Sequence, residues 1–555
     1  MTAPPTSDQT PAPAPSVSRR ALLGLSAAAA AGALPALDLV TGSATAAPAS
    51  PVVTAADVVR AGPLPVTAPN RTQVLHLLRR ATYGQTPVDV ARVTKMGTRA
   101  WLEQQLKPST IADPAAVTIR ALYPEAGWSI AQVYQQVKAG HISRFGWDVM
   151  IPLSEYTIAM ATWSSRQLNE LMVEFWSNHL NVANPSDGVW DSRQSYDHDV
   201  IRANALGKFS HLLAASAAHP AMLNYLNQAD STKDAPNENY GRELLELHTV
   251  GIGARYTEAE VLASARIMTG YTLQWDESLP RYGEFVYDPS IHWTGRVTVL
   301  GFTHPNTAAD GRAVVNAYLS YLAHHPATAR RIATKLAVHF VSDNPPPALV
   351  SRLAAAYLKY DTDIVPVLRV LFTSAEFAAS PFRKVRRPYE DMVATLRTLG
   401  YGLLSNRHPT PVRRAGPEAL YWMSDRLQHA PLAWPQPDGY PDVATSWTAG
   451  GGLLARWNMH LGLAAGWWPN STQIYKPSAT SLLPPLRSTT TYLALVNALA
   501  ARLTGSALPA VHTAAVLTFL GKRPTDRVHT TDQWVTWDIE RMLALVLDTP
   551  NHQMR

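Results

Sequence analysis

The chain has 555 residues, of which 46% are apolar and 16% charged, which is enough for a large hydrophobic core and excludes a disordered protein. The formal charge of +6 is small for this length and the basic residues are scattered, so we expect no nucleic-acid partner. The chain contains no cysteine, which excludes disulfides, zinc–thiolate sites and cysteine nucleophiles.

The first residues have the features of an export signal. Ser18-Arg19-Arg20 precedes an Ala-rich apolar run to about Val40, and Ser43-Ala44-Thr45-Ala46 supplies small residues for cleavage. We therefore predict a twin-arginine signal peptide over residues 1–46, cleaved after Ala46, and a secreted or extracytoplasmic mature protein. Substrates of this pathway cross the membrane folded, often with a cofactor loaded, so the signal also favours a bound metal ion or prosthetic group.

The alternative to cleavage is a membrane anchor, but Gly24, Gly32 and Pro35 leave the apolar run short and weakly hydrophobic. No later stretch is apolar over the length needed to cross a bilayer, so we expect no transmembrane segment in the mature chain. Residues 47–70 are rich in Pro and Ala, which predicts a disordered linker.

Helical patterns dominate the remaining sequence. Apolar spacing and turn signals predict a mainly all-α protein with a single large helical domain over residues 71–550, and two subdomains that divide near 303–310 are the alternative. In the first predicted helix, His76 and Arg80 lie four residues apart on one face. We expect them to form a buried, hydrogen-bonded pair.

A further predicted helical region, from Ile151 to Asn181, ends in polar side chains. Glu174 and His179 lie on different faces near its end. A protonated His179 would gain from the dipole at the helix C-terminus. The same side chain could serve as a metal ligand or a general base, and the sequence leaves these roles open.

The stretch Pro236–Gly253 predicts one short helix, capped by Asp234 or Asn237 and ended by Gly251 in a left-handed conformation. At about 100° per residue, polar side chains gather along one stripe and apolar ones on the other side. The stripe holds Asn239, Glu243 and Glu246 with Glu238 and Arg242 beside it, and the other side holds Tyr240, Leu244, Leu247 and His248.

Two carboxylates one helical turn apart, Glu243 and Glu246, can act as acid and base when they are partly buried, or they can hold a hard metal ion. In the competing interpretation, Arg242 and solvent neutralise the stripe and His248 is a hydrogen-bonded core histidine. Residue types alone do not choose between the two.

Alternating β-branched residues predict a small β-hairpin near 284–302, with His292 at its turn. This is the only clear strand signal in the sequence. Long amphipathic helices resume from Ala308 to Leu399, and one of them carries Lys335 and His339 four residues apart.

An irregular segment rich in Trp, Tyr, Pro and Asp follows at Pro431–Asn458. Long loops inside a helical protein are usually functional, because their backbone must be satisfied away from the core. Trp434, Asp438 and Tyr440 are therefore predicted to wall a substrate groove. Packing of the loop across the domain is the alternative.

Together these motifs make the chain similar to the bacterial domain-of-unknown-function 1800 family. The resemblance is carried by His76–Gly84, Phe175–His179, Asn237–Gly251, Arg266–Thr272 and Trp434–Tyr440. It covers most of residues 70–550 and implies a largely helical, often exported bacterial protein without an agreed activity or catalytic residue. The chain departs from the family at His292-Trp293, where the family tends to have His-Asp, so no role of that Asp is carried over.

The first function that fits these features is a secreted hydrolase acting on a polysaccharide or another cell-envelope polymer through paired carboxylates. Its catalytic candidates are Glu243, Glu246, His179 and Glu174, with His248 as a second assisting histidine. Its substrate-binding candidates are Trp434, Asp438, Tyr440, Asn239 and Arg242.

The second function is a metal- or haem-dependent oxidoreductase with His248 and His179 as ligands. The segment around His248 resembles the proximal haem segment of plant-type peroxidases over a handful of residues, too few to favour haem over a carboxylate–histidine metal site. Glu243 and His248 are also five residues apart, a poor spacing for two ligands on a regular helix. The third function is a non-catalytic envelope scaffold or binding protein whose polar groups tie helices together.

Overall fold

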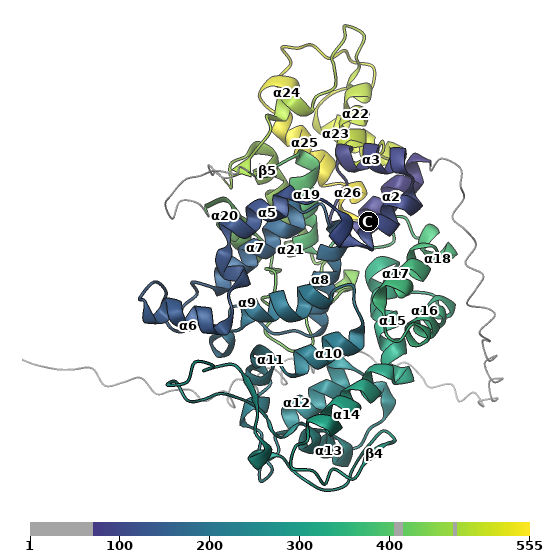
Figure 1. Cartoon of the computed structure of the whole chain (residues 1–555). Coiled ribbons are helices and arrows are strands. Elements are labelled where there is room, and N and C mark those ends of the chain that lie inside the picture. Colours follow the sequence, from purple (N-terminus) through teal and green to yellow (C-terminus); the bar gives the residue numbers. More distant parts are fainter. Residues whose placement is uncertain (1–69, 404–414, 470–473) are drawn as a thin grey trace, which may run out of the picture. The chain divides into compact units, whose positions relative to one another are not determined.

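Helices make up most of the chain in the computed structural model, which describes residues 70–403, 415–469 and 474–555 (Figure 1). The predicted signal peptide and nearly all of the predicted linker lie outside the described residues. The strands of the described part form three separate two-stranded antiparallel sheets. The prediction of a mainly α-helical fold with a small β-element is confirmed.

The first part of the described chain is a series of helices, several of which have N-terminal amides capped by side chains such as Asn70, Thr86, Asp113 and Ser129. In chain order the helices are α2 (Arg71–Ala81), α3 (Pro87–Met96), α4 (Thr98–Gln105), α5 (Pro114–Leu122), α6 (Ile130–Lys138), α7 (Met150–Trp163), α8 (Gln167–His179), α9 (Arg193–Ser195), the π-helix η5 (Tyr196–Arg202), α10 (Phe209–Ala217) and α11 (Pro220–Tyr225).

The middle of the chain contains four of the six short strands. Its elements are α12 (Glu238–Glu243), the π-helix η7 (Leu244–His248), α13 (Glu258–Met268), β1 (Tyr271–Leu273), β2 (Phe285–Tyr287), β3 (Val297–Val299), β4 (Phe302–His304), α14 (Arg312–His324), α15 (Pro326–Phe340), α16 (Pro347–Lys359), α17 (Ile364–Phe372) and α18 (Ala375–Ala378).

The predicted pairing of these strands is corrected. Strand β2 pairs with β1, and β3 pairs with β4, so the segment near 284–302 contributes to two hairpins and not to one. His292 lies between them, buried, with its ring 2.8 Å from the carbonyl oxygen of Thr269 and 3.0 Å from Asn306 Oδ1. The pattern identified β2 and β3 but missed their partners β1 and β4, because pairing depends on contacts outside each strand.

The last part of the chain surrounds one central helix. Its elements are α19 (Pro388–Leu399), β5 (Gly402–Leu403), α20 (Ala415–Arg426), α21 (Gly450–Ala465), β6 (Ile474–Tyr475), α22 (Tyr492–Thr504), α23 (Ala510–Phe519), α24 (Gln533–Thr536), α25 (Ile539–Leu547) and α26 (Pro550–Gln553). All residues of α19 are buried, and α7, α20, α21 and α22 pack around it.

Two chain segments far apart in the sequence meet at the start of α19. The backbone amide of Arg555 donates to the carbonyl of Lys384 at 2.8 Å, and the amide of Arg386 donates to the carbonyl of Gln553 at 2.8 Å. This antiparallel bridge holds the C-terminal end of the chain, which follows α26 (Figure 1), beside the segment that leads into α19. The main hydrophobic core runs from α2 to α25 as one cluster.

His76 and Arg80 are both buried, as the sequence predicted, but each bonds a distant backbone group and not its neighbour. His76 Nε2 donates to the carbonyl of Phe377 at 2.7 Å, and Arg80 Nη2 donates to the carbonyl of Ser380 at 2.7 Å. The pair therefore holds α2 against the end of α18.

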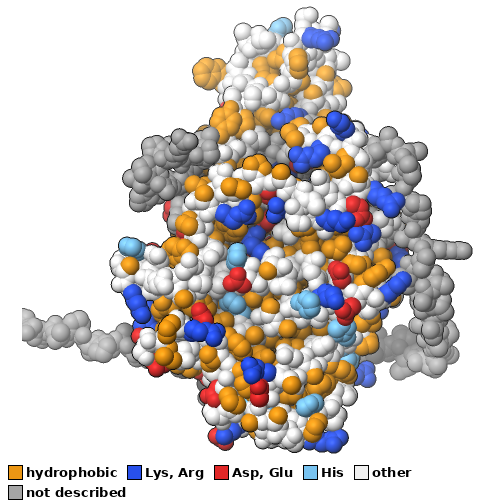
Figure 2. Space-filling view, viewed as in Figure 1, with side chains coloured by type: hydrophobic (Ala, Val, Ile, Leu, Met, Phe, Trp, Pro, Cys, Tyr) orange, Lys and Arg blue, Asp and Glu red, His pale blue; other side chains and the backbone are white. Residues whose placement is uncertain are grey.

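No helix of the described part combines the length and the apolar composition that a membrane span requires. On the face shown in Figure 2, acidic and basic side chains are interspersed, without a continuous band of one sign.

Gly241 tests the packing of α12 on α13. A Cβ at this position would lie 2.8 Å from the backbone nitrogen of Ala265, so the two helices would have to separate. We expect Gly241→Ala to lower the free energy of unfolding by about 1–3 kcal/mol in chemical denaturation. Gly253→Ala is the matched control, because a Cβ at Gly253 meets nothing within 4 Å. Equal effects of the two substitutions would contradict this packing.

Candidate functional site

Helix α12 continues into the wider turn η7. The backbone carbonyls of this turn accept hydrogen bonds from several other residues. The carbonyl of Leu244 accepts from Thr249 Oγ1 at 2.6 Å, and that of Leu245 accepts from the amide of Gly251 at 2.8 Å. The carbonyl of Leu247 accepts from Arg331 Nε at 3.3 Å, and that of His248 accepts from His179 Nε2 at 3.0 Å. These bonds satisfy carbonyls that a helix end leaves without partners. Such π turns are rare and occur frequently at functional sites.

Of the two predicted caps, Asp234 and Asn237, the cap is Asn237, whose side chain accepts from the amide of Asn239. The predicted end is corrected: the regular α-helix ends at Glu243, and the π turn extends it to His248. Gly251 has the predicted positive φ, +80°, and its lack of a Cβ also admits Arg331, since a Cβ would lie 2.8 Å from Arg331 Nη1. The positive φ favours glycine here, and a Cβ would also displace the end of the Arg331 side chain.

The polar stripe of this helix is partly exposed. Arg242 turns away from it, toward Glu258 at 2.5 Å and Glu238 at 3.3 Å. Among the described residues, neither Glu243 nor Glu246 forms an ion pair, and Tyr256 Oη lies 3.5 Å from Glu246 Oε2. The scaffold hypothesis requires arginine side chains that neutralise the stripe. The described residues form no such ion pair with Glu243 or Glu246.

The loop from Trp434 to Tyr440 is clamped to the end of α8. Asn178 donates from Nδ2 to the carbonyl of Tyr440 at 2.8 Å and accepts from its amide at 2.6 Å. Asn181 Nδ2 donates to the carbonyls of Trp434 and Gln436. Gly439, with φ +75°, lies so close to Asn178 that a Cβ would fall 2.1 Å from its backbone oxygen.

This clamp positions an exposed carboxylate, Asp438, whose Oδ1 accepts from Trp434 Nε1 at 2.8 Å. Asp438 lies near Glu243, and we refer to Glu243, Glu246 and Asp438 as the carboxylate cluster. Burial raises the pKa of Glu243, and the negative charges of Glu246 and Asp438 raise it further. Glu243 therefore keeps its proton to a higher pH than an ordinary glutamate does.

The amine of Lys335 faces the same region from α15. Its Nζ donates to His179 Nδ1 at 3.0 Å, while His179 Nε2 donates to the carbonyl of His248. Burial, with Arg331 beside it, lowers the pKa of Lys335 to about 7, although Asp438 nearby acts in the opposite direction. A partly exposed lysine of this kind can act as a base or nucleophile near neutral pH.

The two predicted metal-ligating histidines do not fit a metal ion in this arrangement. Both ring nitrogens of His179 are engaged, one by Lys335 and the other by a carbonyl. His248 is fully buried, and burial together with Lys335 and Arg331 lowers its pKa to about 3. A cation bound to either ring would lie beside two positively charged side chains.

Glu174 belongs to a different, buried network. Its Oε2 accepts from Arg387 Nη2 at 2.6 Å, and the same guanidinium bonds Glu390 at 2.9 Å. Glu174 also lines a cavity of about 20 Å³ with Asn178 and Tyr440, which is room for about one water. The structure therefore separates Glu174 from Glu243 and Glu246 and commits its charge to an arginine.

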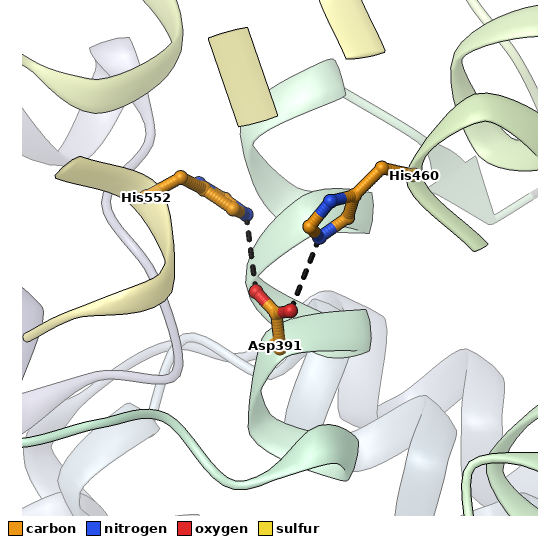
Figure 3. A group of neighbouring side chains, drawn as sticks. All are labelled: Asp391, His460 and His552. Atoms are coloured by element: carbon orange, nitrogen blue, oxygen red, sulfur yellow. Dashed lines mark hydrogen bonds and ion pairs between the residues drawn. The ribbon is translucent and has the colours of Figure 1, made fainter. Parts of the chain in front are cut away.

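A second buried cluster surrounds Asp391 (Figure 3). The rings of His460 and His552 approach its two oxygens from different sides, at 3.1 and 3.4 Å. Arg456 Nε donates to Asp391 Oδ2 at 2.7 Å, and His460 Nδ1 donates to Asp548 at 2.8 Å. Burial acts to raise the pKa of Asp391, but Arg456 and His460 outweigh it and hold the pKa well below its ordinary value.

Two groups of carboxylates and imidazoles among the described residues come close enough to hold a metal ion. They are Glu174, His339 and Glu390, and Asp391, His460 and His552. In each group an arginine already supplies the positive charge, Arg387 in the first and Arg456 in the second. A divalent cation would be repelled there, so both groups are better explained as structural ion pairs.

The described contacts connect several of the predicted site residues, but Glu174 is held in a buried ion pair and the predicted groove residue Tyr440 is buried. Glu243, Glu246 and Asp438 gather near His179 and His248, with Trp434 beside Asp438 and with Asn239 and Arg242 on the exposed side of α12. Tyr440 is buried and bonds the carbonyl of Ala430 at 2.9 Å, so it supports the loop.

Sequence reasoning missed Lys335 and Arg331. The only available signal was the four-residue spacing of Lys335 and His339 on one helix. The helix that carries both residues links the site to the buried network. His339 lies one turn beyond Lys335, and its Nδ1 donates to Asp442 at 2.6 Å.

The ionisation of Lys335 can be measured by competitive acetylation followed by peptide mass spectrometry. We expect its acetylation rate to rise with a midpoint near pH 7, because burial and Arg331 disfavour its charged form. The exposed Lys107 is an internal control for the reagent. A midpoint above pH 9 for Lys335 would contradict the proposed environment.

Asp391→Asn tests the buried cluster. A carboxylate whose pKa is lowered on folding stabilises the protein above its unfolded pKa, near 4, and this contribution is lost as the pH falls below that value. We expect the substitution to lower the free energy of unfolding by about 3–5 kcal/mol at pH 7, and the difference from the unsubstituted protein to shrink as the pH falls below about 4.

Asp234→Asn, at an exposed position, is the control for Asp391→Asn. Because Arg456 carries the compensating charge, a chelator should leave the thermal midpoint of the unsubstituted protein unchanged. A large loss of stability on chelation would instead show that a metal ion supports the fold.

Comparison with known families agrees with the motifs. The family model described as "Protein of unknown function (DUF1800)" matches residues 76–554, most of the chain, so the chain belongs to this family. No curated protein and no solved structure matches the chain.

Proposed function

For this member of the DUF1800 family, we propose acid–base hydrolysis of a polysaccharide or another cell-envelope polymer at the carboxylate cluster. One observation carries the proposal: Glu243 and Glu246 are partly exposed, form no ion pair among the described residues, and have a third carboxylate, Asp438, beside them. Carboxylates that serve only as structural ties are paired, as Glu174 and Asp391 are.

The three carboxylates have different roles in this proposal. Glu243, whose pKa is raised, is the general acid that protonates the leaving oxygen of the scissile bond. An ionised neighbour, Glu246 or Asp438, either activates a water molecule or attacks the sugar carbon directly. Tyr256, near Glu246, helps to orient that carboxylate.

Aromatic side chains border the cluster and suit a carbohydrate substrate. Trp434 is partly exposed, packs with its ring centroid 5.0 Å from that of Tyr440, and is fixed by its bond to Asp438. Tyr225 Oη donates to the carbonyl of Pro435 at 2.9 Å, so it supports the same loop. A rigid ring beside carboxylates can stack on the apolar face of a sugar.

The proposed location agrees with the proposed chemistry. If the twin-arginine signal over residues 1–46 is used, the mature chain meets extracytoplasmic polymers as its natural substrates. The oxidoreductase alternative receives less support, since the rings of His179 and His248 lie beside Lys335 and Arg331.

Glu243→Gln tests this function. With purified bacterial envelope polysaccharides as substrates and the release of reducing ends as the measurement, we expect a loss of activity of about 10²–10⁴-fold. The thermal midpoint should stay close to that of the unsubstituted protein, because Glu243 forms no ion pair among the described residues.

Glu258→Gln is the control, since it removes a carboxylate that is ion-paired with Arg242 outside the cluster. Activity that survives in Glu243→Gln would refute the assignment of the general acid. Loss of folding in Glu243→Gln would favour the scaffold alternative.

A further inference from the structure

A second cavity, with no residue in common with the carboxylate cluster, lies between α2, α3 and α22. Its volume is about 420 Å³, within the range of small-molecule sites in proteins. Arg71 of α2, Lys95 of α3 and Arg502 of α22 line it. Arg71 Nε donates to the carbonyl of Gly505 at 3.2 Å, which holds α2 against the end of α22.

The charge that lines this cavity has one sign. Its ionisable lining residues are Arg71, Lys95 and Arg502, and none of them forms an ion pair with another described residue. The nearby Asp89 does not line the cavity, and its carboxylate is engaged by Thr86 at 2.7 Å and by Arg397 at 2.9 Å. No acidic side chain of the described residues therefore pairs with these three positive charges, and Arg71 and Lys95 are exposed to solvent.

Two buried polar atoms of the lining side chains also have no hydrogen-bond partner among the described residues. They are Arg502 Nη1 and Gln85 Oε1, although Gln85 itself is 6% exposed and donates from Nε2 to the carbonyl of Leu503. An unsatisfied buried polar group costs free energy, so both atoms would gain from a hydrogen bond to a ligand in the cavity. An oxyanion of a ligand would accept a hydrogen bond from Arg502 Nη1. A hydroxyl group or a water molecule would donate one to Gln85 Oε1.

The rest of the lining contains two threonines, Thr86 and Thr94, and an apolar wall formed by small side chains that include Val90, Ala91 and Ala501. Bare phosphate or sulfate would leave this wall without contacts. A ligand with a charged head and a compact hydrocarbon body would contact the arginines and the apolar wall together.

We propose that the cavity between α2, α3 and α22 binds a small organic anion, whose phosphate or carboxylate group contacts Arg71, Lys95 and Arg502 and whose apolar body contacts Val90 and Ala501. This site is independent of the proposed hydrolysis, because it shares no residue with the carboxylate cluster.

Titration calorimetry of the whole protein tests the site with phenyl phosphate, benzoate, inorganic phosphate and benzyl alcohol. We expect one equivalent of phenyl phosphate or benzoate to bind, with at least tenfold weaker binding of inorganic phosphate and of the neutral alcohol. Added sodium chloride should weaken binding of the anion. If neither phenyl phosphate nor benzoate binds at about 10 mM, the proposal is wrong. If inorganic phosphate binds as tightly as these two anions, the ligand need not be organic.

Substitutions locate the binding. Arg502→Gln should weaken phenyl phosphate binding at least tenfold, and Lys95→Gln, at an exposed position that does not support the fold, should weaken it about threefold. Arg296→Gln, at an exposed position outside the cavity, is the matched control and should bind normally. Undiminished binding in both Arg502→Gln and Lys95→Gln would place the anion elsewhere and refute the assignment.

Discussion

The rest of the structure depends on charged side chains that are buried at the start of α19. Arg387 bonds Glu174 and Glu390, and Asp391 bonds Arg456, all at 2.9 Å or less. Removing one partner of such a pair leaves an uncompensated charge away from water, which costs several kcal/mol. Because the partners come from distant segments, the pairs fix how those segments pack around the central helix.

The carboxylate cluster is supported from this network. One helix, α8, contributes Glu174 to the buried pairs and also Asn178 and His179, which hold the Trp434–Tyr440 loop and Lys335. Helix α15 makes the second connection, since His339 bonds Asp442 in the network and Lys335 lies one turn earlier at the site. Elements that are rigid in the core thus position the exposed side chains.

The same residue types carry different functions in the two regions because their partners and solvation differ. Asp391 is fully buried and bonded to an arginine, so its charge is permanent and its role is structural. Glu243 is half-buried and close to other carboxylates, so burial and repulsion raise its pKa and let it exchange a proton. Inspection of composition or spacing cannot separate these two environments.

The sequence by itself determined the helical class and the stripe of Glu243 and Glu246, and it narrowed the cap to Asp234 or Asn237, because these features depend on neighbours within one or two turns. Only the tertiary structure decided that Glu174 belongs to a buried ion pair and that Lys335 faces His179, since both facts depend on partners more than 150 residues away. Local periodicity shows which face of a helix is polar, whereas burial and charge partners follow from how distant segments pack.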